Sequence, residues 1–350
     1  MNDETMTAEA TRFLQSLAEI HRRTDPPEDE AYLRLLHQVQ NVLNGEEESL
    51  RPRDEKRRPG GVVQLFTDIP TILVPDLHAR TDFLYSVFAT RVGGEYTLAE
   101  KLNRGEIQVV CVGDAFHSER RGAARWQEAL KEFKEGFKKH KQMDAEMRDS
   151  FGVMEMVILA KIAFPRHFHF LKGNHENIAN ESGEGNHGFR KYALEGPMVF
   201  DYVKRFYGEH FLQTYYEFEK NLPLLTVGNS FLVSHAEPAT FYDRRRITNY
   251  RDDPEVIEGL TWTDNDDAEE GSVEEMLQHF LGPDGATDAI YFGGHRPVGE
   301  LYKLRANNRF VQFHNPDRFI LVRIIDGRSF DVSRDVVEIK DRSRDLLEKE

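Results

Sequence analysis

The sequence has 350 residues, with 46 Lys and Arg against 61 Asp and Glu, and its formal net charge is −15. Its 24 Phe, 12 Tyr and 2 Trp exclude a mainly disordered chain, and its single cysteine excludes a disulfide scaffold. The acidic balance disfavours general binding to nucleic acid, because phosphate contacts need clustered Lys and Arg.

The sequence also bears on localisation. No apolar run approaches the roughly 20 residues that a membrane-spanning helix needs. The first residues, MNDETMTAEATR, lack the basic and then apolar pattern of a signal peptide. A single cysteine suits a reducing compartment. We therefore expect a soluble, cytoplasmic protein that binds neither membranes nor nucleic acid. The oligomeric state stays open.

Residues 1–43 are predicted to form a helical extension. Apolar residues recur there at three- and four-residue steps, first from Phe13 to Ile20 and again from Leu33 to Leu43. Residues 44–61 are predicted to be a solvated linker, because ten of the eighteen are charged and Gly and Pro lie near the ends. Acids interleave its basic stretch RPRDEKRR, so we prefer a connector to a localisation signal.

From about residue 62 short apolar runs recur, each with the length and the β-branched or aromatic content of a buried strand. Helical patterns lie between several of them, which predicts a layered α/β domain over residues 62–335. Residues 336–350 are predicted to be a charged C-terminal tail. The strand-like runs are Thr71–Val74, Ile107–Val112, His167–Leu171, Ser230–Val233, Ala289–Phe292, Phe310–Phe313 and Phe319–Val322.

A helical insertion is predicted within this domain, at about residues 120–163. Four apolar residues from Trp126 to Phe137 form one stripe. The segment Arg120–Lys141 holds eight Lys or Arg and three Glu, which is a local charge of +5. We favour an amphipathic helix with a solvated Lys face over an electropositive wall beside an active site.

Five of the predicted strands are followed by a side chain that can bind a metal ion. Ligands in α/β proteins gather beyond the carboxyl ends of strands, so such side chains can converge on one point however far apart they are in sequence. They are Asp76 and His78, then Asp114, then Asn174 and His175, then His235, and finally His295.

The residue types indicate the kind of metal. Carboxylate, imidazole and amide carbonyl groups suit Mn²⁺, Fe or Zn²⁺, whereas a structural zinc site would be expected to use cysteines. Asp76 and His78 share a face if their segment is extended, so one ion could take both. Asp114 could bridge to a second ion about 3.5–4 Å away, the usual clamp for displacement at phosphorus. The two glycines before His295 indicate a close backbone approach.

Each of these residues also has a purely structural interpretation. A single histidine at a strand end, an Asp that caps a helix or an Asn in a turn is common without a metal. Those interpretations would have to hold independently in five places, so we favour a metal site. We assign Glu176 and Glu237 to capping or to support of the ligands. His314 is assigned equally to the rim of the site or to the core.

Residues 70–325 resemble the calcineurin-like metallophosphoesterases, in particular the PPP-type serine/threonine protein phosphatases and their bacterial relatives. The family pattern is GDxHG, GDxxDRG, GNHE and two later histidines. This chain has PDLH at 75–78, GD at 113–114, GNHE at 173–176, His235 and His295. Leu260–Asp264 also resembles the LxWxDP motif, and Phe313–Pro316 the FSAPNY motif. The resemblance implies an α-β-β-α sandwich of mixed sheets.

The resemblance also implies a dinuclear metal-dependent phosphatase, with Mn²⁺ expected and Fe or Zn²⁺ as alternatives. A hydroxide that bridges the two ions would attack phosphorus, and His175 would protonate the leaving oxygen as general acid. By position in the motifs, Asp76, His78 and Asp114 would hold the first ion, and Asp114, Asn174, His235 and His295 the second.

The chain departs from the family at GDxxDRG, where it has GDAFHSE. His117 replaces the acid that orients the catalytic histidine, and we expect it to lie behind the catalytic residues. Ser118 replaces the arginine that grips phosphate. Other arginines would then bind phosphate, because the guanidinium fork matches its oxygens. We place Arg296 first because it adjoins a ligand, followed by Arg80 and Arg120.

Three functions fit this pattern. The first is a phosphatase acting on phosphoserine or phosphothreonine in proteins. The second is a nucleotide or dinucleoside polyphosphate hydrolase, which the acidic residues 264–270 disfavour. The third is a non-catalytic binding protein, which the intact ligand set disfavours. We therefore expect a phosphorylated protein or a small phosphoester as the partner.

Overall fold

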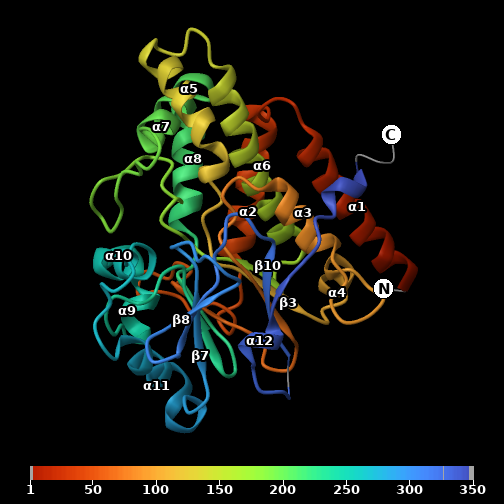
Figure 1. Cartoon of the computed structure of the whole chain (residues 1–350), viewed down its shortest axis with the longest axis vertical. Coiled ribbons are helices and arrows are strands. Elements are labelled where there is room, and N and C mark those ends of the chain that lie inside the picture. Colours follow the sequence, from red (N-terminus) through yellow and green to blue (C-terminus); the bar gives the residue numbers. More distant parts are fainter. Residues whose placement is uncertain (1–2, 326, 347–350) are drawn as a thin grey trace.

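Two mixed β-sheets face each other at the centre of the protein, and helices cover their outer faces (Figure 1). The computed structural model describes residues 3–325 and 327–346. All seven predicted strand regions contain a strand, and four further strands were not predicted. The layered α-β-β-α arrangement confirms the predicted fold class.

The first sheet has five strands, in the order β11-β10-β2-β3-β4. Three of them, β2, β3 and β4, run parallel, and β10 and β11 extend the sheet in antiparallel fashion. The strands are β2 (Thr71–Val74), β3 (Gln108–Cys111), β4 (Phe168–Phe170), β10 (Ile320–Ile324) and β11 (Val336–Glu338).

The second sheet has six strands, in the order β1-β5-β6-β7-β9-β8. It also contains three neighbouring parallel strands, β6, β7 and β9. The strands are β1 (Val62–Gln64), β5 (Leu225–Val227), β6 (Phe231–Val233), β7 (Ile290–Gly293), β8 (Lys303–Arg305) and β9 (Phe310–Gln312).

Alternation along the strands explains why the sheets pack on both faces. In β3, Val110 points into the core between the sheets, where it joins Val233 and Phe292 of the second sheet. Its neighbours Val109 and Cys111 point the other way, into the core beneath the helices. Successive strand residues face opposite sides, so a strand that is apolar throughout is buried on both.

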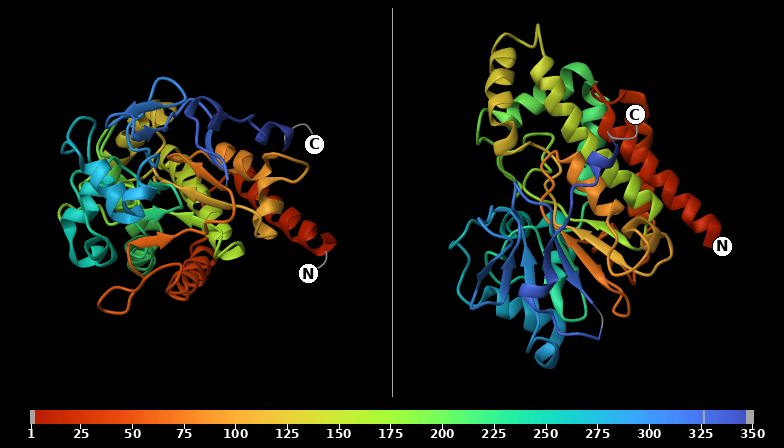
Figure 2. Two further views of the ribbon diagram at one scale, coloured as in Figure 1. Left: turned by 90° about the horizontal axis from the view of Figure 1, so that it is seen from below. Right: turned by 45° about the vertical axis from the view of Figure 1, so that its right-hand side comes forward.

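The helices divide between the two outer faces (Figures 1 and 2). The five-stranded sheet is covered by the larger group, and the six-stranded sheet by α9 to α11. The first group is α1 (Asp3–Arg22), α2 (Asp29–Asn44), α3 (Thr81–Ala89), α4 (Leu98–Asn103), α5 (Ala123–Lys134), α6 (Lys141–Ala163), α7 (Glu195–Phe206) and α8 (Gly208–Lys220). The second group is α9 (Arg244–Thr248), α10 (Pro254–Thr261) and α11 (Ser272–Gly285).

The N-terminal segment forms the two predicted helices, α1 and α2. Leu17 and Leu36 are fully buried in the same core as Phe151 of α6, and the Tyr32 hydroxyl donates to the Phe151 carbonyl over 3.2 Å. The division of the chain into an extension, a linker, a main domain and a tail stays a prediction.

Two segments differ from the predicted solvated connector and tail. Arg51, within the predicted linker, is fully buried and lies 3.0 Å from Glu46. Residues 336–338, within the predicted tail, form the edge strand β11. Arg51 also donates to the Asn221 carbonyl at 2.7 Å, and β11 pairs with β10, so both segments are held by contacts that local charge does not reveal.

The helical insertion matches the amphipathic interpretation. In α5 the buried side chains are Trp126 and Ala129, while Lys131 and Lys134 are exposed. The following helix, α6, is buried on nearly all sides, because α1, α2, α3 and α5 all pack against it.

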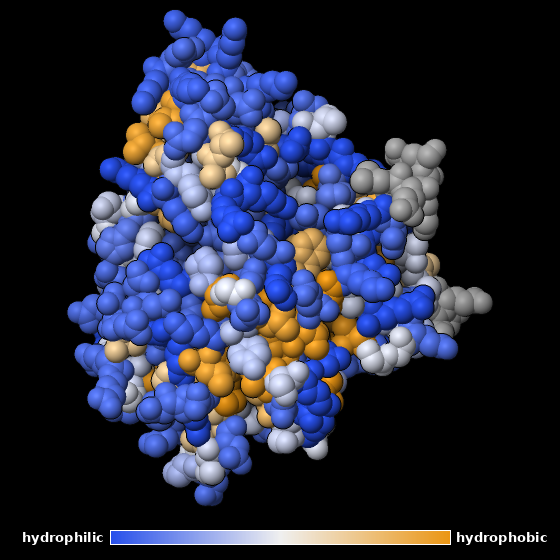
Figure 3. All heavy atoms as spheres, in the orientation of Figure 1, coloured by the Kyte–Doolittle hydropathy of each residue, from blue (hydrophilic) through white to orange (hydrophobic). Residues whose placement is uncertain are grey.

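The outer surface is mainly polar. Among the residues that the structure describes, no helix has both the length and the apolar character to cross a membrane. Figure 3 shows a largely hydrophilic face whose larger apolar area lies in the region where Figure 1 shows β8 and β10, with a smaller one near α5 and α7.

Candidate metal centre

The predicted metal ligands meet where the two sheets come together. Each of the six parallel strands ends at this point, three from either sheet. Asp76 and His78 follow β2, Asp114 follows β3, Asn174 and His175 follow β4, His235 follows β6, His295 follows β7, and His314 follows β9. All eight side chains are buried.

The backbone of these loops is unusual. Four site residues, His78, Asp114, His117 and His295, have φ angles of 44°, 56°, 64° and 63°. This left-handed region costs a non-glycine residue roughly 1–2 kcal/mol. Such conformations concentrate at functional sites, where the surrounding structure holds them in place.

Two glycines make the close approach of the loops possible. A Cβ on Gly294 would lie 1.7 Å from Asp76 Oδ1, and one on Gly173 would lie 2.1 Å from Asp114 Oδ1. Both separations are far inside van der Waals contact, so a side chain at either position would displace a carboxylate. The close approach predicted from the paired glycines before His295 is confirmed.

Glu176 fastens two of the loops together. Its carboxylate accepts hydrogen bonds from the backbone N–H groups of Asp114 at 2.9 Å, Ala115 at 2.8 Å and Gly173 at 2.7 Å. Glu176 therefore holds the loop after β3 against the loop after β4. Glu237 instead lies 2.8 Å from Arg305, in an ion pair.

Backbone carbonyl groups fix the tautomers of His78 and His235. The Nδ1 atom of His78 lies 3.1 Å from the His117 carbonyl oxygen, and that of His235 lies 2.9 Å from the Val112 carbonyl oxygen. A carbonyl only accepts, so each Nδ1 carries the hydrogen and each Nε2 presents a lone pair.

These lone pairs point at other acceptors. His78 Nε2 lies 3.8 Å from Asp76 Oδ2 and 3.6 Å from Asp114 Oδ2. His235 Nε2 lies 3.4 Å from Asp114 Oδ2 and 2.9 Å from Asn174 Oδ1. Electron-rich atoms of neutral imidazoles and carboxylates therefore face one another across a buried space, which is unfavourable unless a cation lies between them.

Several buried polar atoms at this point have no hydrogen-bond partner among the described residues. They are Asp76 Oδ1, Asp114 Oδ2, His117 Nε2, His295 Nε2 and His314 Nδ1. An orphaned buried polar atom is rare in a native structure and calls for an explanation such as an ion.

The charges of the site follow from burial. Burial, together with the carboxylates of Asp76 and Glu176, raises the pKa of Asp114 well above its usual range. Burial lowers the pKa of His78 and of His295 to about 3. The protein thus supplies little positive charge of its own here, and a divalent ion would reverse this balance.

His175 lies against the ligands and is held from behind by His117. The two Nδ1 atoms are 2.7 Å apart, and His175 Nε2 lies 3.8 Å from Asp114 Oδ2. Phe189 stacks on the His117 ring, with ring centres 5.0 Å apart and planes 6° apart. His117 thus lies behind His175.

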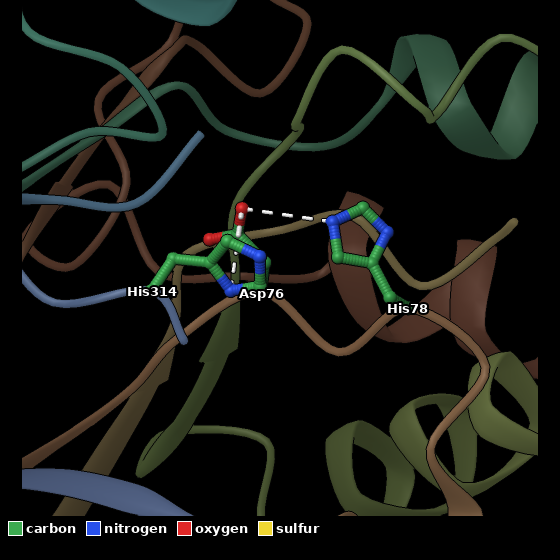
Figure 4. Close-up of side chains that lie close together, drawn as sticks. All are labelled: Asp76, His78 and His314. Atoms are coloured by element: carbon green, nitrogen blue, oxygen red, sulfur yellow. Dashed lines mark ion pairs between the residues drawn. The ribbon is translucent and has the colours of Figure 1, made fainter. Parts of the chain in front are cut away.

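Glu119 was not among the predicted site residues, and His314 was assigned equally to the rim of the site or to the core. The Glu119 carboxylate lies 2.9 Å from His314 Nε2, 2.7 Å from Lys191 Nζ and 4.0 Å from His78 Nε2. Burial opposes ionisation of Glu119, but His78, His314 and Lys191 outweigh it and lower its pKa. Figure 4 shows His78 and His314 on either side of Asp76.

The three predicted phosphate-binding arginines do not converge with the ligands. Arg296 forms a two-pronged ion pair with Asp264, with both contacts at 2.7 Å. Arg80 is buried and donates to backbone carbonyls, among them that of Asp76 at 2.6 Å. Arg120 is exposed and lies 3.7 Å from Asp317.

The donor set fits divalent metal ions. Three overlapping groups of ligand atoms lie within 4.8 Å of one another: Asp76 with His78 and His314, His78 with Asp114 and His175, and Asp76 with Asp114 and His235. Asp76, His78 and Asp114 each belong to two of these groups, so the three groups form one continuous cluster. The cluster is consistent with a dinuclear site of oxygen and nitrogen ligands.

Comparison with known proteins agrees with this chemistry. A family model described as calcineurin-like phosphoesterase matches residues 69–322. No curated protein matches the chain.

Solved structures show a similar fold. A protein serine/threonine phosphatase from Saccharomyces cerevisiae, described as similar to human phosphatase PP5, aligns with a TM-score of 0.52 at 14% identity over 90% of each chain. A cold-active protein-tyrosine phosphatase of a psychrophilic Shewanella species aligns over 76% of this chain and 78% of its own, at 14% identity with a TM-score of 0.43. The yeast protein shows the fold alone, and the Shewanella likeness carries no argument.

Proposed function

The chain belongs to the calcineurin-like phosphoesterase family, and we propose that it is a dinuclear metal-dependent phosphomonoester hydrolase acting on phosphoserine or phosphothreonine in proteins. Family membership makes it a metal-dependent phosphatase, while the substrate is our proposal. One observation carries the dinuclear site. The Nε2 lone pairs of His78 and His235 converge on Asp114 Oδ2, at 3.6 and 3.4 Å, and this oxygen has no hydrogen-bond partner among the described residues.

We propose two sets of ligands that share one carboxylate. Mn²⁺ is the proposed metal, and Fe and Zn²⁺ suit the same donors. When bound, such ions lower the pKa of a water molecule and neutralise charge on the phosphoryl oxygens. The sets are Asp76, His78 and Asp114 for one ion, and Asp114, Asn174, His235 and His295 for the other.

We propose His175 as the general acid. Its Nδ1 is occupied by His117 at 2.7 Å, so its Nε2 is the nitrogen that faces the ligands, 3.8 Å from Asp114 Oδ2. A proton on Nε2 is therefore directed to the side where the ester oxygen would leave. His117 positions this ring, and Phe189 holds His117 in turn.

The charges around the site support a protein substrate over a nucleotide. A groove beside Arg296 is lined by Glu255, Glu258, Asp264 and Asp267. Such a surface repels a polyphosphate and suits a basic stretch of a phosphoprotein. Arg296 is the first proposed phosphate contact and would exchange Asp264 for phosphate. Arg120 is the second. Arg80 would first have to release several backbone carbonyls.

The test is hydrolysis of p-nitrophenyl phosphate by protein that is stripped of metal and resupplied with Mn²⁺. We expect metal-dependent turnover that is lost in Asp114→Asn and His175→Asn and kept in the exposed controls Asp288→Asn and His210→Asn. A panel of phosphopeptides and nucleotides then decides the substrate, and preference for a dinucleoside polyphosphate would overturn the proposed one. Metal binding without turnover on any phosphoester would indicate a binding protein.

The compartment is proposed from composition. A chain with one cysteine, which is buried, suits the reducing cytoplasm. Fractionation of cells that express a tagged chain would test this.

A further inference from the structure

We propose that His314 is a further protein ligand of the first metal ion, through its Nδ1 atom, and that Glu119 and Lys191 hold it in that role. The inference rests on the proposed dinuclear function and deepens it. His314 follows β9 and is fully buried. It lies outside the motifs from which the resemblance assigns metal ligands.

The position of Nδ1 is the first observation. It lies 3.9 Å from Asp76 Oδ2, and the rings of His314 and His78 have centres 5.1 Å apart. Figure 4 shows both rings directed at the Asp76 carboxylate. Ligand atoms of these three residues all lie within 4.8 Å of one another. Bonds of about 2.0–2.2 Å from one ion can reach them after small side-chain rotations.

The hydrogen-bond state of the ring is the second observation. Glu119 Oε2 lies 2.9 Å from His314 Nε2, and Glu119 Oε1 lies 2.7 Å from Lys191 Nζ. An ionised carboxylate only accepts, so Nε2 carries the hydrogen and, in the neutral ring, Nδ1 keeps its lone pair. A histidine that binds a metal with one nitrogen while donating from the other to a carboxylate is the usual arrangement at metal sites.

The competing interpretation is an ion pair without metal. A doubly protonated His314 would donate from Nε2 to Glu119 and from Nδ1 to Asp76. The second contact, at 3.9 Å, is too long for a hydrogen bond, and Nδ1 has no partner among the described residues. A neutral core histidine would likewise leave Nδ1 buried and unsatisfied, at a cost of about 1–3 kcal/mol. A metal ion at Nδ1 removes both difficulties.

Glu119 also explains the altered motif. The family's GDxxDRG is here GDAFHSE. The motif's second aspartate is replaced by His117, and an acid, Glu119, follows two residues later. That acid lies beside the first ion's ligands, 4.0 Å from His78 Nε2. We infer that this chain, in which Ser118 stands in place of the phosphate-gripping arginine, has at Glu119 a carboxylate that supports an extra imidazole and so strengthens the hold on the first ion.

The test measures metal binding directly, with Co²⁺ alone added to metal-stripped protein. We expect two ions per chain in the parent protein. His314→Gln should weaken one of them by roughly 10-fold or more, and Glu119→Gln by roughly 10-fold. The exposed histidine control His210→Gln should leave both affinities unchanged. Asn174→Ala should weaken binding of the other ion instead. The double variant His314→Gln/Asn174→Ala should therefore bind both ions weakly.

A second measurement leaves His314 itself unchanged. Co²⁺ shifts the ring protons of its histidine ligands in NMR spectra, and an N–H held by a carboxylate exchanges slowly. In the parent protein we expect a shifted, solvent-exchangeable signal from the His314 Nε2–H. In the Glu119→Gln variant this hydrogen should exchange with solvent faster. Absence of any such signal from His314, or parent affinities in a folded His314→Gln protein, would overturn the inference.

The outcomes separate this inference from the proposed function. Two bound ions, with one weakened in His314→Gln, support the ligand assignment even if no phosphoester is hydrolysed, in which case the proposed activity alone fails. Turnover with unchanged Co²⁺ binding in His314→Gln overturns the ligand assignment alone. A parent chain that binds no Co²⁺ overturns both.

Discussion

Two of the buried groups of charged side chains in the described residues differ in how their carboxylates are paired. In one, which we call the Glu46 cluster, Glu46 lies 3.0 Å from Arg51 and 2.6 Å from Lys161. The other is the metal centre, where Asp76 and Asp114 each have an oxygen without a partner among the described residues. In the Glu46 cluster the cations are side chains of the protein itself, Arg51 and Lys161. At the metal centre no lysine or arginine among the described residues pairs with the carboxylates of Asp76 and Asp114.

The pKa values register this difference. Burial opposes ionisation of Glu46, but Lys161 and Arg51 outweigh it and lower its pKa to about 2. At the metal centre burial raises the pKa of Asp76 and of Asp114. Comparable burial therefore gives opposite shifts, because lysine and arginine pair with Glu46, whereas no lysine or arginine among the described residues pairs with the carboxylate of Asp76 or Asp114. A buried carboxylate with a raised pKa and an unpaired oxygen is typical of a functional site.

The largest expected effect comes from Asp114→Asn. Activity should fall by roughly 10³-fold or more, because the shared ligand of both ions is lost. The metal-free protein should nevertheless become more stable by about 1–3 kcal/mol, because an unpaired buried carboxylate is removed. Urea unfolding with a chelator present measures this, with Asp288→Asn as the exposed control. A less stable metal-free variant would contradict the comparison.

Glu46→Gln should do the reverse. We expect a loss of about 3 kcal/mol in the free energy of unfolding, since Arg51 and Lys161 would remain buried without their counter-charge. The turnover of the folded fraction should not change. The neighbouring exposed Glu47→Gln is the matched control. Equal unfolding midpoints for the two variants would show that the cluster contributes nothing.

His117→Ala has a smaller expected effect, inside the metal centre itself. His117 holds His175 through an Nδ1–Nδ1 contact of 2.7 Å and is not placed among the ligands. We therefore expect kcat to fall roughly 10- to 100-fold, about 1.4–2.7 kcal/mol, with unchanged metal content. Metal analysis beside kinetics, with His210→Ala as control, checks this. Loss of a bound ion would instead make His117 part of the ligand shell.

The smallest effect is the pH dependence of the Glu46 cluster. The folded pKa of Glu46, about 2, lies below its ordinary value of 4.5. Its stabilisation is thus fully present above pH 4.5 and is lost as the pH falls toward 2. The stability gap between the parent and Glu46→Gln should narrow by roughly 1 kcal/mol between pH 7 and pH 4. A gap that widens on acidification would contradict this assignment.

Much of the fold and of the metal centre could be predicted, because the sequence signals for them lie within short segments. Strand runs such as Ile107–Val112 are apolar throughout, and a ligand at the end of a strand needs no knowledge of distant residues to be noticed. Short strands such as β1 and β8 have three residues each, too few for a period to show. Arg51 could not be placed, since a charged residue in a charged segment gives no sign that it will be buried.

His314 and Glu119 show the limit more sharply. They lie 195 residues apart, and neither residue alone indicates a metal site. Their meaning depends on a 2.9 Å contact that exists only once both sheets are in place. The same holds for Arg80, predicted as a phosphate contact, whose guanidinium the fold instead directs to backbone carbonyls such as that of Asp76.

The burial of the N-terminal helices has a consequence for synthesis of the chain. Leu17 and Leu36 share their core with Phe151, Tyr215 and Phe218, which are made last of the five. At about 5–20 residues per second, roughly 10–40 seconds separate the first helix from its final partners on the ribosome. During that interval the apolar faces of α1 and α2 lack these partners, so we expect the nascent chain to be most prone to aggregation before Phe218 has been made.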